Sequence, residues 1–233
     1  MRQAGIREAR QNLSLLLDDV REGREILITD RGRPVARLLA PLPLSVRSFP
    51  GRRALRRRMP DLEPRLSQSI TAGAAIRIPR RLQTPFSGPL YLDSTALAKL
   101  YLPEPGSDAI DQALRGRRDL SVSDLAATEL IAAFAFRARG RDLANAVAHL
   151  QSAVLDDLDS GVFRHVEPSP QTHRTAQRLA MSLGGQDPAR STLVLHLALA
   201  VSASATTVVT FDRQLADACV RVGMMTFPEI KNI

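Results

Sequence analysis

Apolar residues near the start of the chain recur at helical spacing. The four that carry the pattern, at positions i, i+3, i+4 and i+7, are Leu13, Leu16, Leu17 and Val20. This spacing places them on one face and predicts an amphipathic helix within residues 6–22. Gly23 follows at once, and glycine commonly ends a helix because it adopts the left-handed conformation without strain.

Two β-forming runs follow this helix. Residues 25–29 and 34–39 flank a turn at residues 30–32, so the pattern predicts a hairpin. A helix and a hairpin bury little apolar surface, and a unit of this size seldom folds alone. We therefore expect residues 1–41 to form a small module that dimerises.

The segment over residues 42–89 is rich in proline and arginine. Seven prolines interrupt it, and arginines cluster at residues 52–53 and 56–58. Such a sequence buries too little apolar surface to fold by itself. We expect a basic arm and linker, with short helices around residues 52–58 and 62–73 if the segment docks on a folded surface.

Strand-like and helix-like runs alternate from residue 90 to the end of the chain. Short β-type runs at residues 90–93, 119–123 and 206–211 are separated by helical stretches. This alternation is typical of an α/β fold with a mainly parallel sheet flanked by helices. The predicted organisation is therefore a helix-plus-hairpin module, an arm, and an α/β domain over residues 90–233.

Charge divides the chain at the same place. Residues 1–89 hold 18 Arg and 8 acids, whereas residues 90–233 hold 14 Lys and Arg against 16 acids, in a chain of net charge +8. A basic first half indicates a nucleic-acid partner, and its contrast with the second half favours contact between the two. GC-rich coding explains the choice of Arg over Lys, but not its concentration before residue 90.

Composition narrows the class of protein. A hydrophobic fraction of 44% and a charged fraction of 24% are typical of globular proteins. No apolar run is long enough for a membrane span, and the first residues lack the apolar centre of a secretory signal. The single cysteine, Cys219, cannot form an internal disulfide, so we expect a cytoplasmic protein without a membrane partner.

Three carboxylates stand where an α/β fold places its chemistry. Asp93 and Asp212 each end a predicted strand, and Glu129 lies in the helix after the strand that ends at Ser123. Sites in parallel sheets form at the carboxyl ends of strands, so these acids could converge. Clustered oxygen ligands suit Mg²⁺ or Mn²⁺. Each acid could equally be a helix cap or a solvated charge.

Four separated motifs resemble those of VapC-type toxins of the PIN family. In the family's order they are residues 92–101 (LDSTALAKLY), 128–130 (TEL), 195–198 (LHLA) and 209–212 (VTFD). The resemblance covers residues 90–228 and implies metal-dependent cleavage of RNA. It assigns Asp93, Glu129 and Asp212 as catalytic and metal-binding acids, with Mg²⁺ or Mn²⁺ as the cofactor.

The third motif departs from the family pattern. Three residues before His196, where the family has Asp, this chain has Leu193, which cannot bind a metal. Asp187 lies on the wrong helical face to replace the missing acid, and a cap before Pro188 is its simpler role. We expect His196 to pack in an apolar helix. Loss of one acid should weaken metal binding, so ribonuclease activity is expected to be weak or absent.

The first module resembles Phd/YefM-type antitoxins. The residues that carry the likeness are Glu8 to Leu13, Ile26 to Thr29, Gly32, and Pro34 to Ala36. The resemblance implies a homodimer, or a higher homo-oligomer, that binds operator DNA. It assigns Arg10 and Arg31 to DNA binding, and we add Arg7 and Arg33 on charge alone.

The arm is similar to VapB-type tails that neutralise PIN toxins. Residues 76–81 read IRIPRR, and a guanidinium of Arg77, Arg80 or Arg81 can pair with the acids and displace a metal. The contact could form within one chain or be exchanged between protomers. The alternative is a flexible linker.

The sequence thus indicates an antitoxin–toxin fusion with operator DNA and RNA as partners. Its PIN domain resembles an endoribonuclease that the arm holds inactive. Two alternatives stay open. The PIN domain could be the degenerate body of a DNA-binding transcriptional repressor, which Leu193 favours. It could also be an active nuclease that is released by cleavage in the arm.

Overall fold

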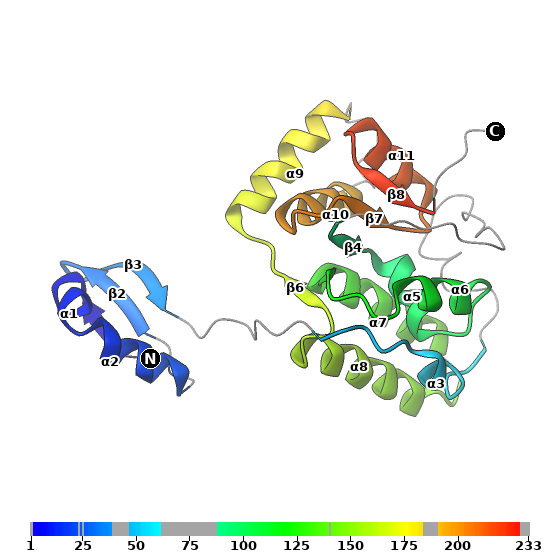
Figure 1. Ribbon diagram of the computed structural model, residues 1–233, viewed down its shortest axis with the longest axis horizontal. Helices are drawn as coiled ribbons and strands as arrows, with labels where there is room; N and C mark the ends of the chain where they lie inside the picture. The colour runs from blue at the N-terminus through cyan, green and yellow to red at the C-terminus, as the bar shows by residue number, and fades with distance from the viewer. Residues whose placement is uncertain are drawn as a thin grey trace. The chain divides into compact units, whose positions relative to one another are not determined.

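The computed structural model describes residues 2–22, 24, 26–38, 47–61, 88–139, 141–183 and 191–228. The chain divides into two compact units, residues 1–44 and residues 45–233 (Figure 1). The first unit holds the predicted helix-plus-hairpin module. The second holds the predicted α/β domain together with the described first part of the arm.

The first unit contains a three-stranded sheet. β2 (Ile26–Asp30) and β3 (Arg33–Leu38) form the predicted hairpin, with Arg31 and Gly32 at positive φ in its turn. The sequence pattern does not predict β1 (Arg2–Gly5), which pairs in parallel with β2. Its sequence, RQAG, has no alternation of apolar residues, and it becomes a strand because β2 offers it a free edge.

The predicted N-terminal helix is divided in two. α1 (Ile6–Gln11) and α2 (Leu13–Arg21) meet at Asn12. The small core of the unit consists of Ala4, Leu16, Val20, Ile26 and Ile28. Leu13 and Leu17, from the same predicted apolar face, are 48% and 40% exposed. The unit therefore leaves apolar surface exposed, and the dimer stays a prediction.

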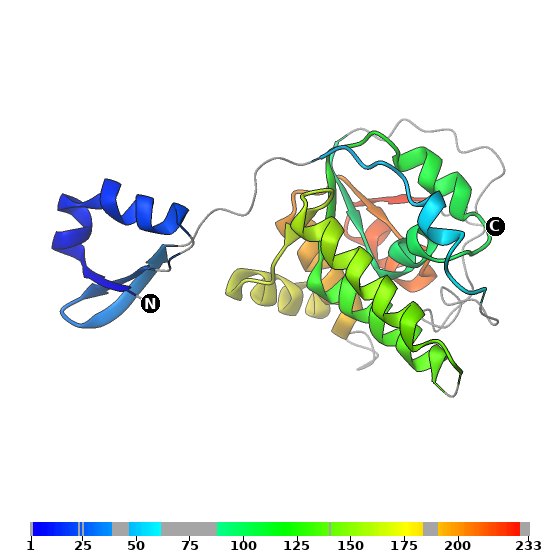
Figure 2. The same ribbon diagram turned by 90° about the horizontal axis from the view of Figure 1, so that it is seen from below.

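The second unit is built on a five-stranded sheet with helices on both faces (Figures 1 and 2). The strand order is β6-β5-β4-β7-β8, and each neighbouring pair is parallel. The strands are β4 (Leu90–Leu92), β5 (Leu120–Ser123), β6 (Arg164–Val166), β7 (Thr207–Val209) and β8 (Met225–Phe227). The predicted α/β fold with a mainly parallel sheet is confirmed.

Helices connect these strands and divide the core between the two faces of the sheet. They are α5 (Ser94–Tyr101), α6 (Ser107–Leu114), α7 (Asp124–Ala138), α8 (Ala144–Asp159), α9 (Pro170–Ser182), α10 (Ser191–Ser202) and α11 (Arg213–Arg221). Side chains alternate along a strand, so Leu90 and Leu92 pack with α5 to α8, while Tyr91 packs with α10 and α11. Among the described helices, none is both long and apolar enough to cross a membrane.

The first part of the predicted arm, residues 47–61, packs within the second unit (cyan in Figure 2). It contains one helical turn, α3 (Arg53–Arg56), inside the first stretch expected to become helical on docking. Phe49 and Met59 of this segment belong to the core cluster that includes α5, α6, α7 and α8. The other expected helix, over residues 62–73, lies outside the described residues.

Candidate functional site

Two of the three predicted acids follow neighbouring strands. Asp93 comes directly after β4 and Asp212 lies three residues after β7, and these strands are hydrogen-bonded to each other. Each acid also begins a helix. Asp93 accepts a hydrogen bond from the Ala96 N–H at 2.8 Å, and Asp212 accepts one from the Gln214 N–H at 2.7 Å. Both carboxylates are therefore helix caps, whatever further chemistry they perform.

Asp93 is buried among neutral hydrogen-bond donors. Its carboxylate accepts bonds from the hydroxyls of Thr95 at 2.8 Å and Thr210 at 2.5 Å, in addition to the Ala96 N–H. Burial raises the pKa of Asp93 to about 6, although the charge of His196 and these hydrogen bonds oppose the rise. The Asp93 anion is thus poorly solvated, and a cation at this place would stabilise it.

Glu129 reaches from α7 to residues of α5 and α10. Its carboxylate accepts a hydrogen bond from the Ser94 hydroxyl at 2.7 Å and lies 2.9 Å from His196 Nε2. Burial by itself would raise the pKa of Glu129, but the hydrogen bond and charge of His196, with the bond from Ser94, outweigh it and lower the pKa. His196 is buried, yet it pairs with an acid instead of only packing among apolar neighbours.

His196 is the centre of a buried polar chain that the sequence analysis did not find. Its Nδ1 lies 2.8 Å from the Tyr91 hydroxyl, which lies 2.8 Å from the Ser123 hydroxyl. Burial raises the pKa of Tyr91 well above its ordinary range, so the hydroxyl keeps its proton. The available signal was Tyr91 itself, which places a polar group between Leu90 and Leu92 in an apolar strand.

Leu193 occupies the position where the family pattern has an acid. It is 9% exposed and belongs to an apolar cluster with Tyr91 and Leu197, one turn before His196 on α10. An apolar side chain in this place disfavours a hydrated cation, because the ion would lose water without gaining a ligand. The weakening of metal binding by Leu193 stays a prediction.

The side chains as they lie do not fit a divalent metal ion held by three acids. Within the part of the chain that the structure describes, no three His, Cys, Asp or Glu side chains gather in a metal-binding arrangement. Glu129 is engaged by His196, and both oxygens of Asp93 accept hydrogen bonds. Metal binding and catalysis by Asp93, Glu129 and Asp212 stay predictions.

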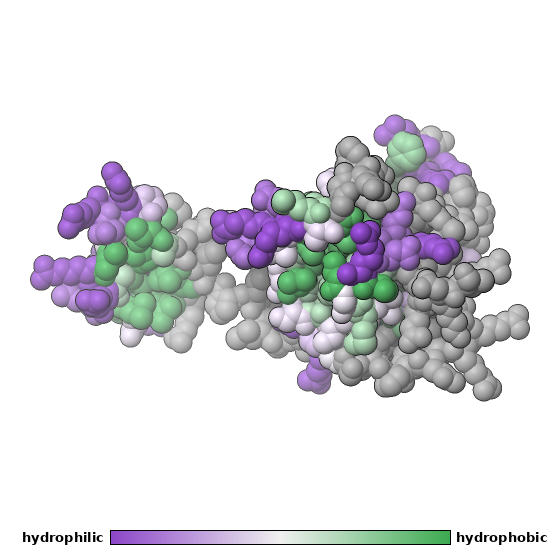
Figure 3. Space-filling model, turned by 90° about the horizontal axis from the view of Figure 1, so that it is seen from above, coloured by the Kyte–Doolittle hydropathy of each residue, from purple (hydrophilic) through white to green (hydrophobic). Residues whose placement is uncertain are grey.

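The predicted DNA-binding arginines lie on the first unit. Arg7 and Arg10 are on α1, and Arg31 and Arg33 are at the hairpin; all four are exposed. Figure 3 shows apolar surface flanked by hydrophilic side chains on this unit. Exposed guanidinium groups are suited to phosphate contacts on DNA, and these DNA-binding roles also stay predictions.

The arginines predicted to neutralise the acids, Arg77, Arg80 and Arg81, lie outside the described residues. Asp187 and Pro188, assigned to a helix cap, lie outside them as well. The first described part of the arm, residues 47–61, contacts the PIN-like unit through other arginines, Arg52, Arg53 and Arg56.

Comparisons with known proteins match both parts of the chain to known families. The model of the PIN domain family matches residues 90–220, which is more than half of the chain, so the chain belongs to the PIN domain family. The model of the antitoxin Phd_YefM, of type II toxin–antitoxin systems, matches residues 1–69. The chain is thus an antitoxin domain fused to a PIN domain, as the sequence analysis predicted.

Individual relatives cover parts of the chain. Antitoxin VapB46, from two strains of Mycobacterium tuberculosis, is 58% identical over 43 residues, which make up 18% of this chain and 41% of the relative. The chain therefore spans about two-fifths of the length of these curated relatives.

Two solved structures cover a larger share of the chain at low identity. FitAcB from Neisseria gonorrhoeae is 17% identical with a TM-score of 0.43, and covers 59% of this chain and 96% of that chain. FitAB bound to an IR36 DNA fragment is 16% identical with a TM-score of 0.48, and covers 59% of this chain and 93% of that chain.

Proposed function

We propose that this chain is an antitoxin–toxin fusion that binds operator DNA as a homodimer and carries a PIN domain with weak or absent ribonuclease activity. The observation that carries the second part is the burial of Leu193 in apolar surroundings, one helical turn from the paired His196 and Glu129. We include in the proposal a cytoplasmic location and, for any residual RNA cleavage, Mg²⁺ or Mn²⁺.

DNA binding is supported by the charge and exposure of the first unit. A dimer would double the four exposed arginines, Arg7, Arg10, Arg31 and Arg33, and present them to two half-sites of a symmetric operator. Each guanidinium that contacts a phosphate releases counterions, so affinity should fall steeply with added salt.

The first prediction concerns this DNA contact. In a mobility-shift titration of the full chain, Arg10→Ala with Arg31→Ala should weaken operator binding by roughly 2 kcal/mol or more, and the salt dependence should become shallower. Arg58→Ala, which removes an exposed arginine from the second unit, serves as the control. Unchanged affinity in the double variant would contradict the proposed DNA contact.

For RNA cleavage, the chain has three of the acids in the family pattern, Asp93, Glu129 and Asp212, but lacks the one at position 193. Asp93 and Asp212 follow neighbouring strands, and the buried Asp93 anion has no arginine among the contacts that engage its carboxylate within the described residues. A divalent ion bound there would supply charge neutralisation for a phosphodiester. With Leu193 in place of the third acid, less negative charge faces the ion, and Mg²⁺ gives up its water reluctantly. We also propose that Arg77, Arg80 or Arg81 covers these acids.

The second prediction tests cleavage directly. The full chain with Arg77, Arg80 and Arg81 changed to Ala should cleave RNA weakly or not at all in Mg²⁺ or Mn²⁺. Adding Leu193→Asp should restore cleavage by at least roughly 100-fold, the scale of one missing group that acts on the transition state. A further Asp93→Asn change should abolish the restored activity. Robust cleavage before Leu193 is replaced would show that the third acid is dispensable.

A second candidate function is favoured by the same burial of Leu193. The PIN domain could serve only as the body of a DNA-binding transcriptional repressor. This candidate predicts that the Leu193→Asp chain binds operator DNA normally and still fails to cleave RNA in either metal.

A further inference from the structure

We propose that residues 47–61, here named the strap, are a permanent part of the folded PIN domain, so that removal of the antitoxin half cannot leave a free, folded toxin. The strap lies within the span matched by the antitoxin family model, yet it packs in the same compact unit as the PIN domain. This role of the strap in folding does not depend on whether the PIN domain cleaves RNA.

The strap joins the PIN domain through its backbone and its apolar side chains. The Phe49 N–H donates to the Arg117 carbonyl at 2.8 Å, and the Gly116 N–H donates to the Phe49 carbonyl at 2.9 Å. The Phe49 side chain is 1% exposed, with its ring centroid 5.8 Å from that of Phe163. Met59, at the other end of the strap, is buried in the same cluster. The strap therefore contributes to the main core.

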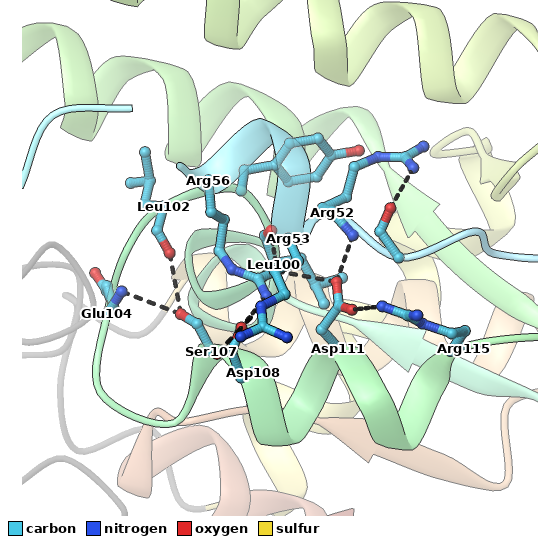
Figure 4. Close-up of polar contacts among 12 residues, drawn as sticks. Arg52, Arg53, Arg56, Leu100, Leu102, Glu104, Ser107, Asp108, Asp111 and Arg115 are labelled. Atoms are coloured by element: carbon cyan, nitrogen blue, oxygen red, sulfur yellow. Dashed lines mark hydrogen bonds and ion pairs between the residues drawn. The ribbon is translucent and has the colours of Figure 1, made fainter. Parts of the chain in front are cut away.

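Arg56 of the strap forms a buried ion pair with Asp111 of α6 (Figure 4). Its Nη1 lies 2.9 Å from Asp111 Oδ1 and donates to the Leu100 carbonyl at 2.9 Å, while Nη2 donates to Asp108 at 2.7 Å. Arg56 is 4% exposed and Asp111 is 2% exposed. A guanidinium buried to this extent needs its hydrogen-bond acceptors to stay in place, and a buried carboxylate needs its donors.

Arg52, four residues earlier, makes a second contact of the same kind. Its guanidinium binds both oxygens of Asp157 on α8, with Nε donating to Oδ2 at 2.6 Å, and the Tyr101 hydroxyl donates to the same carboxylate. The backbone N–H of Arg52 donates to Asp111, so one residue of the strap engages both acids (Figure 4). The Arg52 guanidinium also lies 5.4 Å from the ring centroid of Phe49.

These contacts define what the PIN surface recognises. It takes an aromatic side chain followed by two arginines four residues apart on a helical turn, which is the pattern of Phe49, Arg52 and Arg56. Without the strap, Asp157 would lose the guanidinium of Arg52, and Asp111 would keep only Arg115, a half-exposed side chain at the end of its own helix. Removing one partner of a buried ion pair leaves an uncompensated charge and is strongly destabilising. A domain cut to residues 88–233 is therefore expected to be unstable.

The first test cuts the full chain without removing any part of it. A protease recognition sequence is inserted within residues 62–87, and the cut protein is run on gel filtration at about 0.15 M salt. We expect the two fragments to elute together, with a thermal unfolding midpoint of the PIN domain close to that of the uncut chain. Release of a separate, folded C-terminal fragment with an unchanged midpoint would overturn the proposal.

The second test weakens the strap in the uncut chain. Arg56→Ala should lower the unfolding midpoint of the PIN domain by roughly 10 °C, whereas Arg58→Ala, an exposed arginine of the same segment, should shift it by less than about 2 °C. If Arg56→Ala does not fold, Arg52→Lys keeps the charge but loses the two-point contact, and should lower the midpoint by a few degrees. The proposal would be contradicted if the unfolding midpoint of Arg56→Ala, or that of Arg52→Lys in its place, equalled the midpoint of the control Arg58→Ala.

Discussion

Within the described residues of the PIN domain, the buried acids at the strap and at the end of the sheet have different partners. At the strap, Asp111 and Asp157 face the guanidinium groups of Arg56 and Arg52. Burial by itself would raise the pKa of Asp111, but hydrogen bonds from the Arg52 backbone and from arginine side chains outweigh it and lower the pKa. At the end of the sheet, Asp93 is held by neutral donors, and burial raises its pKa to about 6.

The difference separates an acid that stabilises the fold from an acid that costs stability. An ionised Asp111 lowers the energy of the folded state through its arginine partners, whereas an ionised Asp93 raises it. A buried acid with a perturbed pKa and no arginine among its described contacts is a candidate site for a cation or for chemistry, and this is the role that we propose for Asp93. In this chain the arrangement is incomplete, because Leu193 brings apolar surface where the family pattern has an acid.

The largest effect is expected at the strap cluster. Asp157→Ala leaves Arg52 and the Tyr101 hydroxyl without their shared acceptor, so it should lower the free energy of unfolding of the PIN domain by about 3–5 kcal/mol. Asp156→Ala, at an exposed position on the same helix, is the matched control and should change it by less than about 0.5 kcal/mol. Urea titration of the full chain measures both; equal values would mean that the strap pairs do not hold the fold.

Asp93 should show the opposite behaviour. Its folded-state pKa lies above the ordinary value, so the protonated form is the stabilising one, and that stability is lost as the pH rises through about 6. Asp93→Asn removes the titration. The unfolding free energy of the variant relative to the natural chain should therefore increase from pH 4 to pH 8, by up to about 3 kcal/mol. If the difference in unfolding free energy between the two proteins does not change with pH, burial does not destabilise the Asp93 anion.

A smaller effect is expected in the polar chain beside Asp93. Tyr91→Phe keeps the packing of the ring but leaves His196 Nδ1 and the Ser123 hydroxyl without their shared partner. The loss should cost about 1–2 kcal/mol in unfolding free energy. NMR should show the His196 ring resonances shifted in Tyr91→Phe, because the ring loses this hydrogen bond. The control is Phe163→Leu, a change in the apolar core near the strap, which should alter stability without shifting these resonances.

The sequence allowed most of the fold to be predicted. The hairpin, the alternation of strands and helices, and the placing of Asp93 and Asp212 after strands all depend on local patterns of residues. The break at Asn12 and the strand β1 (Arg2–Gly5) do not, because they depend on how the helix and the hairpin edge meet. A helix around residues 52–58 was predicted only if the segment docks on a folded surface, and α3 does form where this segment packs within the second unit.

The partners in both acid clusters could not be predicted from local sequence. Arg52 binds acids that lie 59 and 105 residues away, and Tyr91 and His196 are separated by 105 residues. Nothing near any of these residues marks its partner. The predicted arm contact used Arg77, Arg80 and Arg81 because they form the most visible basic motif. In the described part of the arm, the buried arginine contacts with the PIN domain come instead from Arg52 and Arg56.

The most direct test of this account is a calorimetric titration of Mn²⁺ into the full chain, because binding of the ion is measured without any assumption about the RNA substrate. The arm variant with Arg77, Arg80 and Arg81 changed to Ala is titrated beside the same variant carrying Leu193→Asp. We expect weak binding without Leu193→Asp and binding at least roughly tenfold tighter with it, lost again on Asp93→Asn. Tight, saturable binding while Leu193 is in place, with no gain from the added acid, would contradict this expectation.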